Sequence, residues 1–187
     1  HPQFKSQYLK LSRDIVIYLP PSYSHSSKKY PVLYVQDGQN IFDRSTAFGG
    51  TEWKLDEHTE HLIHTHKINE VIIVGIYNTS QRIDEYTWHS MVLDGEQMGG
   101  AGAQYARFLV EELKPFIDKT YRTYADRDHT AIMGSSLGGL ISFYLGLHYS
   151  PYFSKLGLVS PSLWWADKKA LDEVDTLRND FSLWIDI

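Results

Sequence analysis

Ser136 is the residue of this chain whose surroundings point most directly to chemistry, because it has Gly134 two positions before it and Gly138 two positions after it. Gly-x-Ser-x-Gly is the pattern of a nucleophile elbow, a sharp strand-to-helix turn that exposes a serine hydroxyl. A side chain at either glycine would collide with the neighbouring backbone. An apolar run at 129–133 and a helix-compatible run at 140–147 favour the elbow over a Ser/Gly-rich loop. The chemistry would be nucleophilic catalysis by the hydroxyl of Ser136.

The composition indicates a single globular domain, and we expect it to span residues 1–187. The chain has 187 residues, of which 42% are hydrophobic, and its net charge is −5. A negative charge argues against nucleic acid or an anionic membrane surface as a partner. The absence of cysteine excludes disulfides, thiolate metal sites and a cysteine nucleophile. No apolar run approaches the ~20 residues that span a bilayer.

Predicted strands and helices alternate along the chain. Strands are expected at 13–19, 31–36, 71–76, 129–133, 155–160 and 181–187, and helices at 52–66, 103–119, 137–149 and 167–178. Pro115 is expected to kink the 103–119 helix or to mark its last turn. Apolar strands separated by helices predict an α/β fold, with a mostly parallel sheet and helices on both faces.

Three loops with suggestive residues leave strands at the carboxyl edge of this sheet, where such folds place their chemistry. They hold residues 37–40, 135–137 and 161–165. Among these residues Asp37, Trp164 and Trp165 are candidates to line a substrate. We expect one tryptophan to be buried and the other to face the substrate, because adjacent residues rarely share one environment.

Several segments, in order over nearly the whole chain, resemble the Putative esterase (esterase D-like) family of α/β-hydrolases. This family includes enterochelin esterases and some feruloyl and acetylxylan esterases. The matching segments are residues 18–23, 30–40 (with Asp37-Gly38-Gln39-Asn40), 111–117, 132–140 and 160–165. The resemblance implies an α/β-hydrolase fold and a serine esterase activity, without implying one particular ester.

The candidate site then has a nucleophile and two amides. Ser136 is the nucleophile, and the elbow rule makes the backbone N–H of Leu137 one oxyanion donor. The dipole of the helix that starts at Leu137 also favours a negative charge there. The resemblance implies that the backbone N–H of Gln39 is the second donor, the alternative being that Asp37-Gly38 forms a plain turn. Asp37 could orient that loop.

The acid and the histidine of the triad are missing from this pattern. In this fold they follow the serine, in that order, and only His148 follows Ser136. His148 lies twelve positions along the helix, about 18 Å from its start, and a base must come within about 3 Å. Asp186 stands near the expected place of the acid. We therefore expect the chain to be C-terminally incomplete, with the acid, a last strand and the histidine loop beyond Ile187.

Other sequence features could indicate a different chemistry, but they are weaker evidence than the pattern around Ser136. His58, His61, His64 and His66 share a predicted helix but point in directions that do not converge, so we expect no metal site. The glycine-rich run 98–102 lacks the Lys-Ser/Thr of a phosphate-binding loop, so no cofactor is expected. Residues 82–86 resemble a family segment near the acyl or sugar side, or form a solvated charged loop.

The sequence therefore predicts a carboxylic ester hydrolase that works through an acyl-enzyme on Ser136. The alternatives are a ferric-siderophore or feruloyl/acetylxylan esterase, or a non-catalytic binding module on the same fold. The expected partner is a small-molecule, glycan or siderophore ester, with no nucleic acid and no membrane. A cytoplasmic location is favoured, and secretion stays open because residue 1 is a histidine. The oligomeric state is left open.

Overall fold

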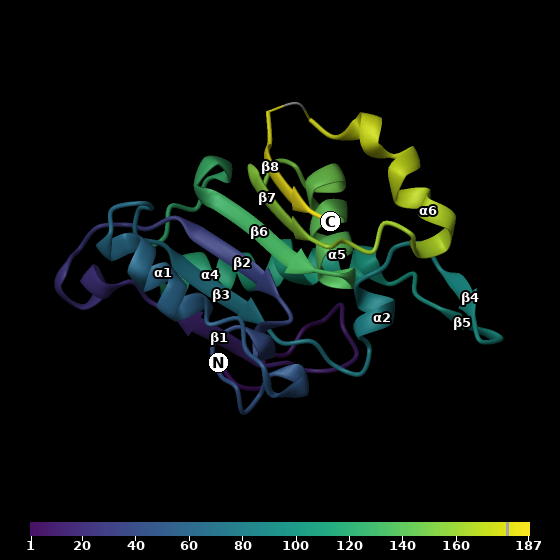
Figure 1. Cartoon of the computed structure of the whole chain (residues 1–187), viewed down its shortest axis with the longest axis horizontal. Helices are drawn as coiled ribbons and strands as arrows, with labels where there is room; N and C mark the ends of the chain where they lie inside the picture. The colour runs from purple at the N-terminus through teal and green to yellow at the C-terminus, as the bar shows by residue number, and fades with distance from the viewer. Residues whose placement is uncertain (179) are drawn as a thin grey trace.

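A six-stranded sheet runs through the molecule in the order β1-β3-β2-β6-β7-β8 (Figure 1). The computed structural model describes residues 1–178 and 180–187. β1 pairs antiparallel with β3, and every other neighbouring pair in this sheet is parallel. The strands are β1 (Ile15–Tyr18), β2 (Val32–Gln36), β3 (Ile72–Ile76), β6 (Thr130–Ser135), β7 (Lys155–Val159) and β8 (Ser182–Asp186). The prediction of a mostly parallel sheet is confirmed.

Helices pack on both faces of the sheet, as predicted. Figure 1 shows α4 (Lys114–Thr120) and α5 (Leu137–His148) behind the strands and α1 (Leu55–His64) in front of them. The larger core lies on the α5 side, where the side chains of residues 137–147 are buried. A smaller core of Val35, Ile41 and Ile73 lies on the other face, with Leu55 of α1 packed against it. Apolar residues all around α5 bury the helix and fix the corner at which it starts.

The helical segment predicted at 103–119 is interrupted by a wider turn. α3 (Gly102–Arg107) leads into a π-helical segment, Phe108–Leu113, and α4 continues to Thr120. Pro115 stands in the first turn of α4, so the prediction that it marks the last turn is wrong. Proline lacks an N–H and crowds the carbonyl four residues earlier. The regular α-helical hydrogen bonds are interrupted in the π-helical segment directly before α4.

Residues 82–98 hold three elements that the sequence analysis did not predict. α2 is one turn, Arg82–Glu85, and β4 (Met91–Leu93) pairs antiparallel with β5 (Glu96–Met98). Asp94 and Gly95 join the two strands with φ angles of 51° and 85°. Asp-Gly is a preferred pair for such a two-residue turn, so this hairpin had a signal in the sequence.

α6 (Trp165–Asp172) is shorter than the helix predicted at 167–178. Its residues Ala166, Asp167 and Lys168 have φ angles between 50° and 65°, so regular right-handed helix is confined to its end. Short 3-10 turns complete the fold at Pro21–His25, Gly38–Asn40, Phe48–Gly50, Arg127–His129 and Val174–Thr176. Among the helices of residues 1–178 and 180–187, none has the length and apolar character needed to cross a bilayer.

Candidate active site

Ser136 occupies a single-residue corner between β6 and α5. Its φ and ψ are 56° and −122°, and the helix begins at the next residue. A Cβ added to Gly134 would lie 2.4 Å from the carbonyl oxygen of Gly138, and one added to Gly138 would lie 3.0 Å from Cβ of Gln36. The strand, turn and helix therefore stand as the motif predicts. The predicted clash with backbone is found at Gly134, whereas a Cβ on Gly138 would crowd the side chains of Gln36 and Asp37.

Backbone hydrogen bonds tie this corner to β7 and to the loop after it. The N–H of Ser136 donates to the carbonyl of Val159 (2.9 Å), and its own carbonyl accepts from the N–H of Ser162 (3.0 Å). The side chain of Ser136 is exposed, and its Oγ lies 3.1 Å from Oγ of Ser162. Ser162 is buried, and the sequence analysis did not single it out within its loop. The corner is thus rigid, while its hydroxyl faces solvent.

The two predicted amide donors follow neighbouring strands. Leu137 begins α5, so its N–H belongs to the first-turn amides that have no acceptor within the helix. Gln39 lies in the 3-10 turn Gly38–Asn40 that follows β2, and β2 is the parallel neighbour of β6. The oxyanion roles of Leu137 and Gln39 stay predictions.

Asp37 is the residue at which the chain leaves β2, and it is almost fully buried. Its carboxylate accepts two hydrogen bonds from Arg82, from Nε at 2.8 Å and from Nη2 at 2.8 Å. A third bond comes from Nδ2 of Asn78 at 2.6 Å. These surroundings do not favour the predicted place of Asp37 along a substrate, because protein groups occupy both of its oxygens. They favour the other predicted role, that of orienting the loop.

The segment 82–86, for which two interpretations were open, is not a solvated loop. Arg82 is half-buried against Asp37, and Glu85 forms a buried ion pair with Arg13 (2.8 Å). Burial opposes the charged form of Arg82, but the hydrogen bonds to Asp37 outweigh it and raise the pKa of the guanidinium above its ordinary value. Both pairs join residues far apart in the sequence, and the sequence analysis predicted neither.

The two tryptophans after β7 have opposite environments, as predicted. Trp164 is 58% exposed, whereas Trp165 is 4% exposed and donates from Nε1 to the carbonyl of His89 (2.7 Å). Trp164 follows Ser162 by two positions, so the exposed ring belongs to the loop that contacts Ser136. That Trp164 lines a substrate stays a prediction.

The histidines do not assemble a metal site within residues 1–178 and 180–187, where no cluster of three or more His, Cys, Asp or Glu side chains could hold an ion. His58, His61, His64 and His66 are all exposed. His148 ends α5, and its Nε2 lies 2.7 Å from Oε2 of Glu173.

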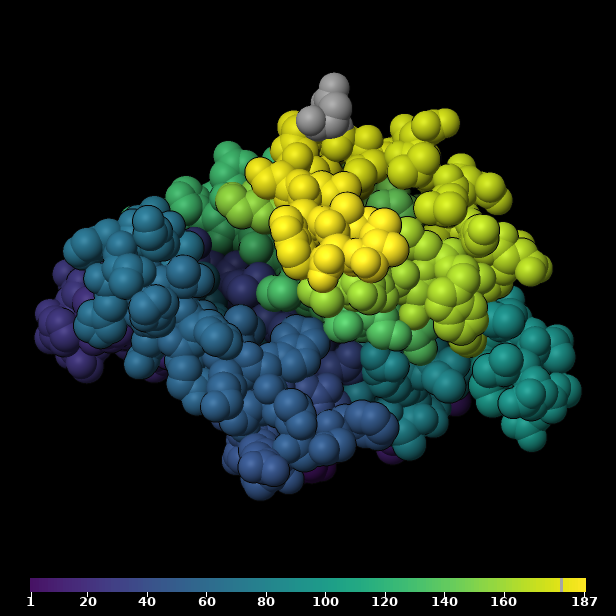
Figure 2. Space-filling view, in the orientation of Figure 1, coloured from purple at the N-terminus to yellow at the C-terminus, as the bar shows by residue number. Residues whose placement is uncertain are grey.

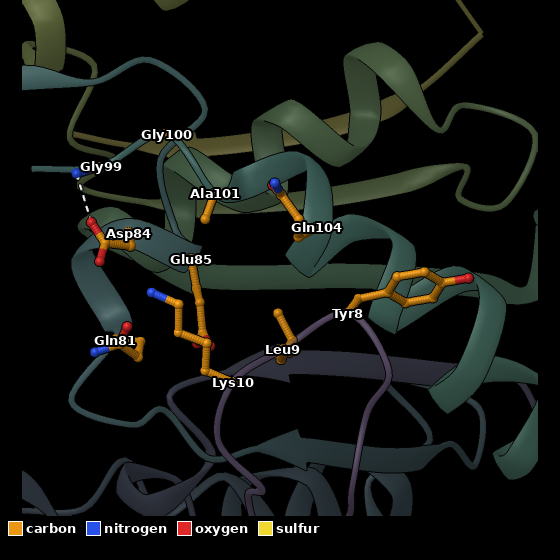
Figure 3. Close-up of a pocket in the computed structure, with 10 residues that line it drawn as sticks. All are labelled: Tyr8, Leu9, Lys10, Gln81, Asp84, Glu85, Gly99, Gly100, Ala101 and Gln104. Carbon is orange, nitrogen blue, oxygen red and sulfur yellow. Dashed lines mark hydrogen bonds between the residues drawn. The ribbon is translucent and has the colours of Figure 1, made fainter.

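A cavity of about 390 Å³ lies beside α2, and it is a different place from the corner at Ser136. Figure 3 shows the side chains around it, which come from the N-terminal segment, from α2 and from the start of α3. Its lining residues are Tyr8, Leu9, Lys10, Gln81, Asp84, Glu85, Gly99, Gly100, Ala101 and Gln104. Asp84 accepts a hydrogen bond from the N–H of Gly99 (2.8 Å), and this bond connects α2 to the segment before α3.

Comparisons with known proteins agree with this arrangement. Residues 6–184 match the family model described as Putative esterase. The chain is 30% identical over 176 residues to the uncharacterized protein YbbA of Bacillus subtilis, covering 92% of this chain and 66% of that protein. It is 26% identical over 163 residues to the iron(III) salmochelin esterase of Escherichia coli, covering 84% of this chain and 34% of that protein.

A solved structure shares both fold and sequence. The crystal structure of an IroE-like serine hydrolase from Shewanella oneidensis superposes with a TM-score of 0.76 at 30% identity, covering 91% of this chain and 52% of that one. The chain therefore spans less than two thirds of the length of each of these three proteins. Because the family model matches nearly every residue, the chain belongs to the Putative esterase family of α/β-hydrolase fold.

Proposed function

We propose that the protein is a serine esterase whose nucleophile is Ser136. The observation that carries this proposal is the exposed hydroxyl of Ser136, presented at a positive φ between β6 and α5. In the proposed reaction, Oγ of Ser136 bonds to the carbonyl carbon of an ester, and the alcohol leaves as the acyl-enzyme forms. Water then adds to the acyl carbon, and the acid leaves as the serine hydroxyl is restored.

The negative charge that develops on the carbonyl oxygen needs donors aimed at it, and we assign them to the amides of Leu137 and Gln39. The first amide stands at the N-terminus of α5, where the helix dipole adds to the attraction. The second stands on the turn after the neighbouring strand β2. Preformed donors of this kind contribute about 10²–10³ each to kcat in serine hydrolases.

The proposed reaction also needs a base within about 3 Å of Oγ of Ser136. In the described part of the chain, the side chain that bonds this oxygen is Ser162, and His148 is paired with Glu173 instead. We therefore expect the 187 residues on their own to hydrolyse esters slowly. An oxyanion hole and a binding surface still give about 10³–10⁴ over water when triad members are removed.

Labelling with a fluorophosphonate tests the proposal, because this reagent forms a covalent bond to an activated serine. The whole protein that carries this chain is treated with the reagent, and the modified residue is located by mass spectrometry. We expect the adduct on Ser136 and its loss in Ser136→Ala. Ser135→Ala is the matched control, since Ser135 is the adjacent serine and lies outside the glycine frame; it should still label. An unlabelled Ser136 would reject the proposal and favour a binding module.

An ester with an aromatic acid is a second, narrower candidate. It is favoured by Trp164, a 58% exposed ring on the loop that contacts Ser136. Offset stacking of two aromatic rings contributes about 0.5–1.5 kcal/mol. Trp164→Ala should therefore lower kcat/KM for a feruloyl ester by about 2- to 13-fold and change that for an acetyl ester little. Trp184→Ala, which removes a ring of equal exposure (57%) on β8, is the control. Equal losses for both esters would reject the aromatic preference.

A further inference from the structure

The turn after β2 carries the Gln39 amide that we assign to the oxyanion. The ion pair between Asp37 and Arg82 holds this turn in place. Arg82 approaches Asp37 with two parallel hydrogen bonds of 2.8 Å, and Asn78 adds one of 2.6 Å. The side chain of Asp37 is 6% exposed and that of Arg82 is 28% exposed. A two-point contact of a guanidinium with a carboxylate fixes orientation as well as distance.

The backbone on both sides of Gln39 is tied to other elements. The N–H of Asp37 donates to Oη of Tyr86 (3.2 Å), and the carbonyl of Gln39 accepts from Oγ1 of Thr46 (2.7 Å). The N–H of Asn78 donates to Oε1 of Gln39 (3.2 Å). Asn78 thus contacts the turn twice, with its side chain on Asp37 and with its backbone on Gln39.

Asp37 needs these contacts because its φ is 57°. Residues other than glycine rarely adopt a left-handed conformation, and they keep it only where the surroundings impose it. The next residue, Gly38, already lies so close to β3 that an added Cβ would be 2.5 Å from the backbone of Gly75. The turn therefore has no room to relax toward β3. The direction of the Gln39 amide therefore depends on how Asp37 is held.

We propose that Arg82, together with Asn78, is a positioning residue for the proposed esterase: by holding Asp37 in its left-handed conformation, it aims the N–H of Gln39 at the oxyanion. The inference rests on the proposed function. Arg82 acts through Asp37 and contacts no reacting atom. Its replacement is therefore expected to slow the chemical step while leaving ground-state binding of the ester in place.

A second buried ion pair provides a control within the same helix. Arg13 donates to Glu85 through Nη2 (2.8 Å) and Nη1 (3.1 Å). Its guanidinium also lies over the rings of Tyr105 (5.5 Å) and Phe108 (5.0 Å). The pair joins α2 to the segment before β1, and the guanidinium of Arg13 donates to Glu85 rather than to Asp37. Arg13→Lys and Arg82→Lys are thus the same substitution at two ion pairs, only one of which holds the turn.

The test compares an oxoester with the thionoester of the same acid and alcohol, using the whole protein that carries this chain. Sulfur is a weak hydrogen-bond acceptor, so the thionoester gains less from a well-aimed amide. We expect Arg82→Lys and Asn78→Ala to lower kcat for the oxoester by about tenfold or more, within the 10²–10³ that one donor contributes. The expected change in KM is less than about threefold, and the kcat ratio of oxoester to thionoester should fall.

Arg13→Lys is expected to lower the melting temperature while leaving the ratio of the two esters as in the unaltered protein. The inference is overturned if Arg82→Lys and Asn78→Ala keep the unaltered ratio, or if Arg13→Lys lowers it equally. Should Arg82→Lys fail to fold, Asn78→Ala decides alone, because it removes one hydrogen bond and leaves the ion pair. Failure of the proposed function is distinguishable, since Ser136 of the unaltered protein would then not label.

Discussion

β3 and β8 are both five-residue strands of the same sheet with apolar residues at their centres, yet their environments are opposite. All five residues of β3 are buried, and all five of β8 are exposed, with Leu183 at 45% and Trp184 at 57%. β3 lies between β1 and β2, whereas β8 pairs with β7 at the end of the strand order. In the space-filling view, β8 lies on the visible surface of the molecule (Figure 2).

The difference shows that burial depends on neighbours rather than on the apolar pattern. A short apolar run predicts a strand but cannot say how many elements will pack on it. The candidate site is built from the buried part of the sheet: the turn with Gln39 follows β2, Asn78 follows β3, and Ser136 follows β6. β8 contributes no residue of the assigned site. The turns that form the candidate site therefore follow buried strands of the sheet.

Truncation of Ile73 in β3 is expected to have the largest effect on stability. Ile73 is fully buried and packs with Val35 and Ile41 in the smaller core. Ile73→Ala should lower the free energy of unfolding by about 2–5 kcal/mol, because it removes apolar contacts and leaves a cavity. Urea denaturation followed by circular dichroism measures it. A cost below 1 kcal/mol would show that the smaller core is not required.

As the pH is lowered, the end of the molecule that carries β8 should lose stability before β3 does. Glu173, directly after α6, accepts hydrogen bonds from Trp88 Nε1 (2.8 Å), and its carboxylate lies 2.9 Å from His89 Nε2 and 2.7 Å from His148 Nε2. Burial favours its protonated form, but these hydrogen bonds outweigh it and lower the pKa of Glu173 below 4.5. The stability that Glu173 contributes is then present above about 4.5, the pKa of an unfolded chain, and is lost as pH falls through the lower folded value.

Glu173→Gln separates this contribution from general acid unfolding. Tryptophan fluorescence reports on the region, because Trp88, Trp164, Trp165 and Trp184 all lie in or near it. Melting temperatures are measured from pH 6 to pH 3 for both proteins. We expect the unaltered protein to lose its advantage over Glu173→Gln below about pH 4.5. A constant difference across this range would contradict the assignment.

Replacement of Trp184 in β8 is expected to have the smallest effect. Threonine, like tryptophan, is suited to a strand, and the indole of Trp184 is largely exposed. Trp184→Thr should change the free energy of unfolding by no more than about 0.5 kcal/mol. A loss above 2 kcal/mol in the same urea experiment would mean that this face is covered in solution, and the contrast between β8 and β3 would then fail.

Local patterns predicted the six strands of the main sheet and the corner at Ser136, because the strand, the two glycines and the helix of that corner are all encoded within residues 129–147. The opposite exposures of Trp164 and Trp165 followed from the same kind of local argument. The ion pair between Asp37 and Arg82 could not be predicted, since its partners are 45 positions apart and meet only when β2 and β3 pair.

Some of what the sequence analysis missed had a local signal and some had none. Asp94-Gly95 is a residue pair preferred in hairpin turns, and it was overlooked. The left-handed backbone of Ala166, Asp167 and Lys168 has no such signal, because residues of these types favour a right-handed helix or a turn. Side chains whose partners come from distant elements, such as Ser162 beside Ser136, needed the fold itself.

The backbone angles of Ser136 have a consequence for the history of this chain. Glycine enters that conformation freely, whereas a residue with a β-carbon strains there by about 1–3 kcal/mol. Ser136→Gly would therefore remove strain, and random mutation filtered by folding alone would drift toward glycine at this position. Selection for a reactive hydroxyl is what would retain the serine, so a descendant that had lost the reaction would be expected to carry glycine at this corner.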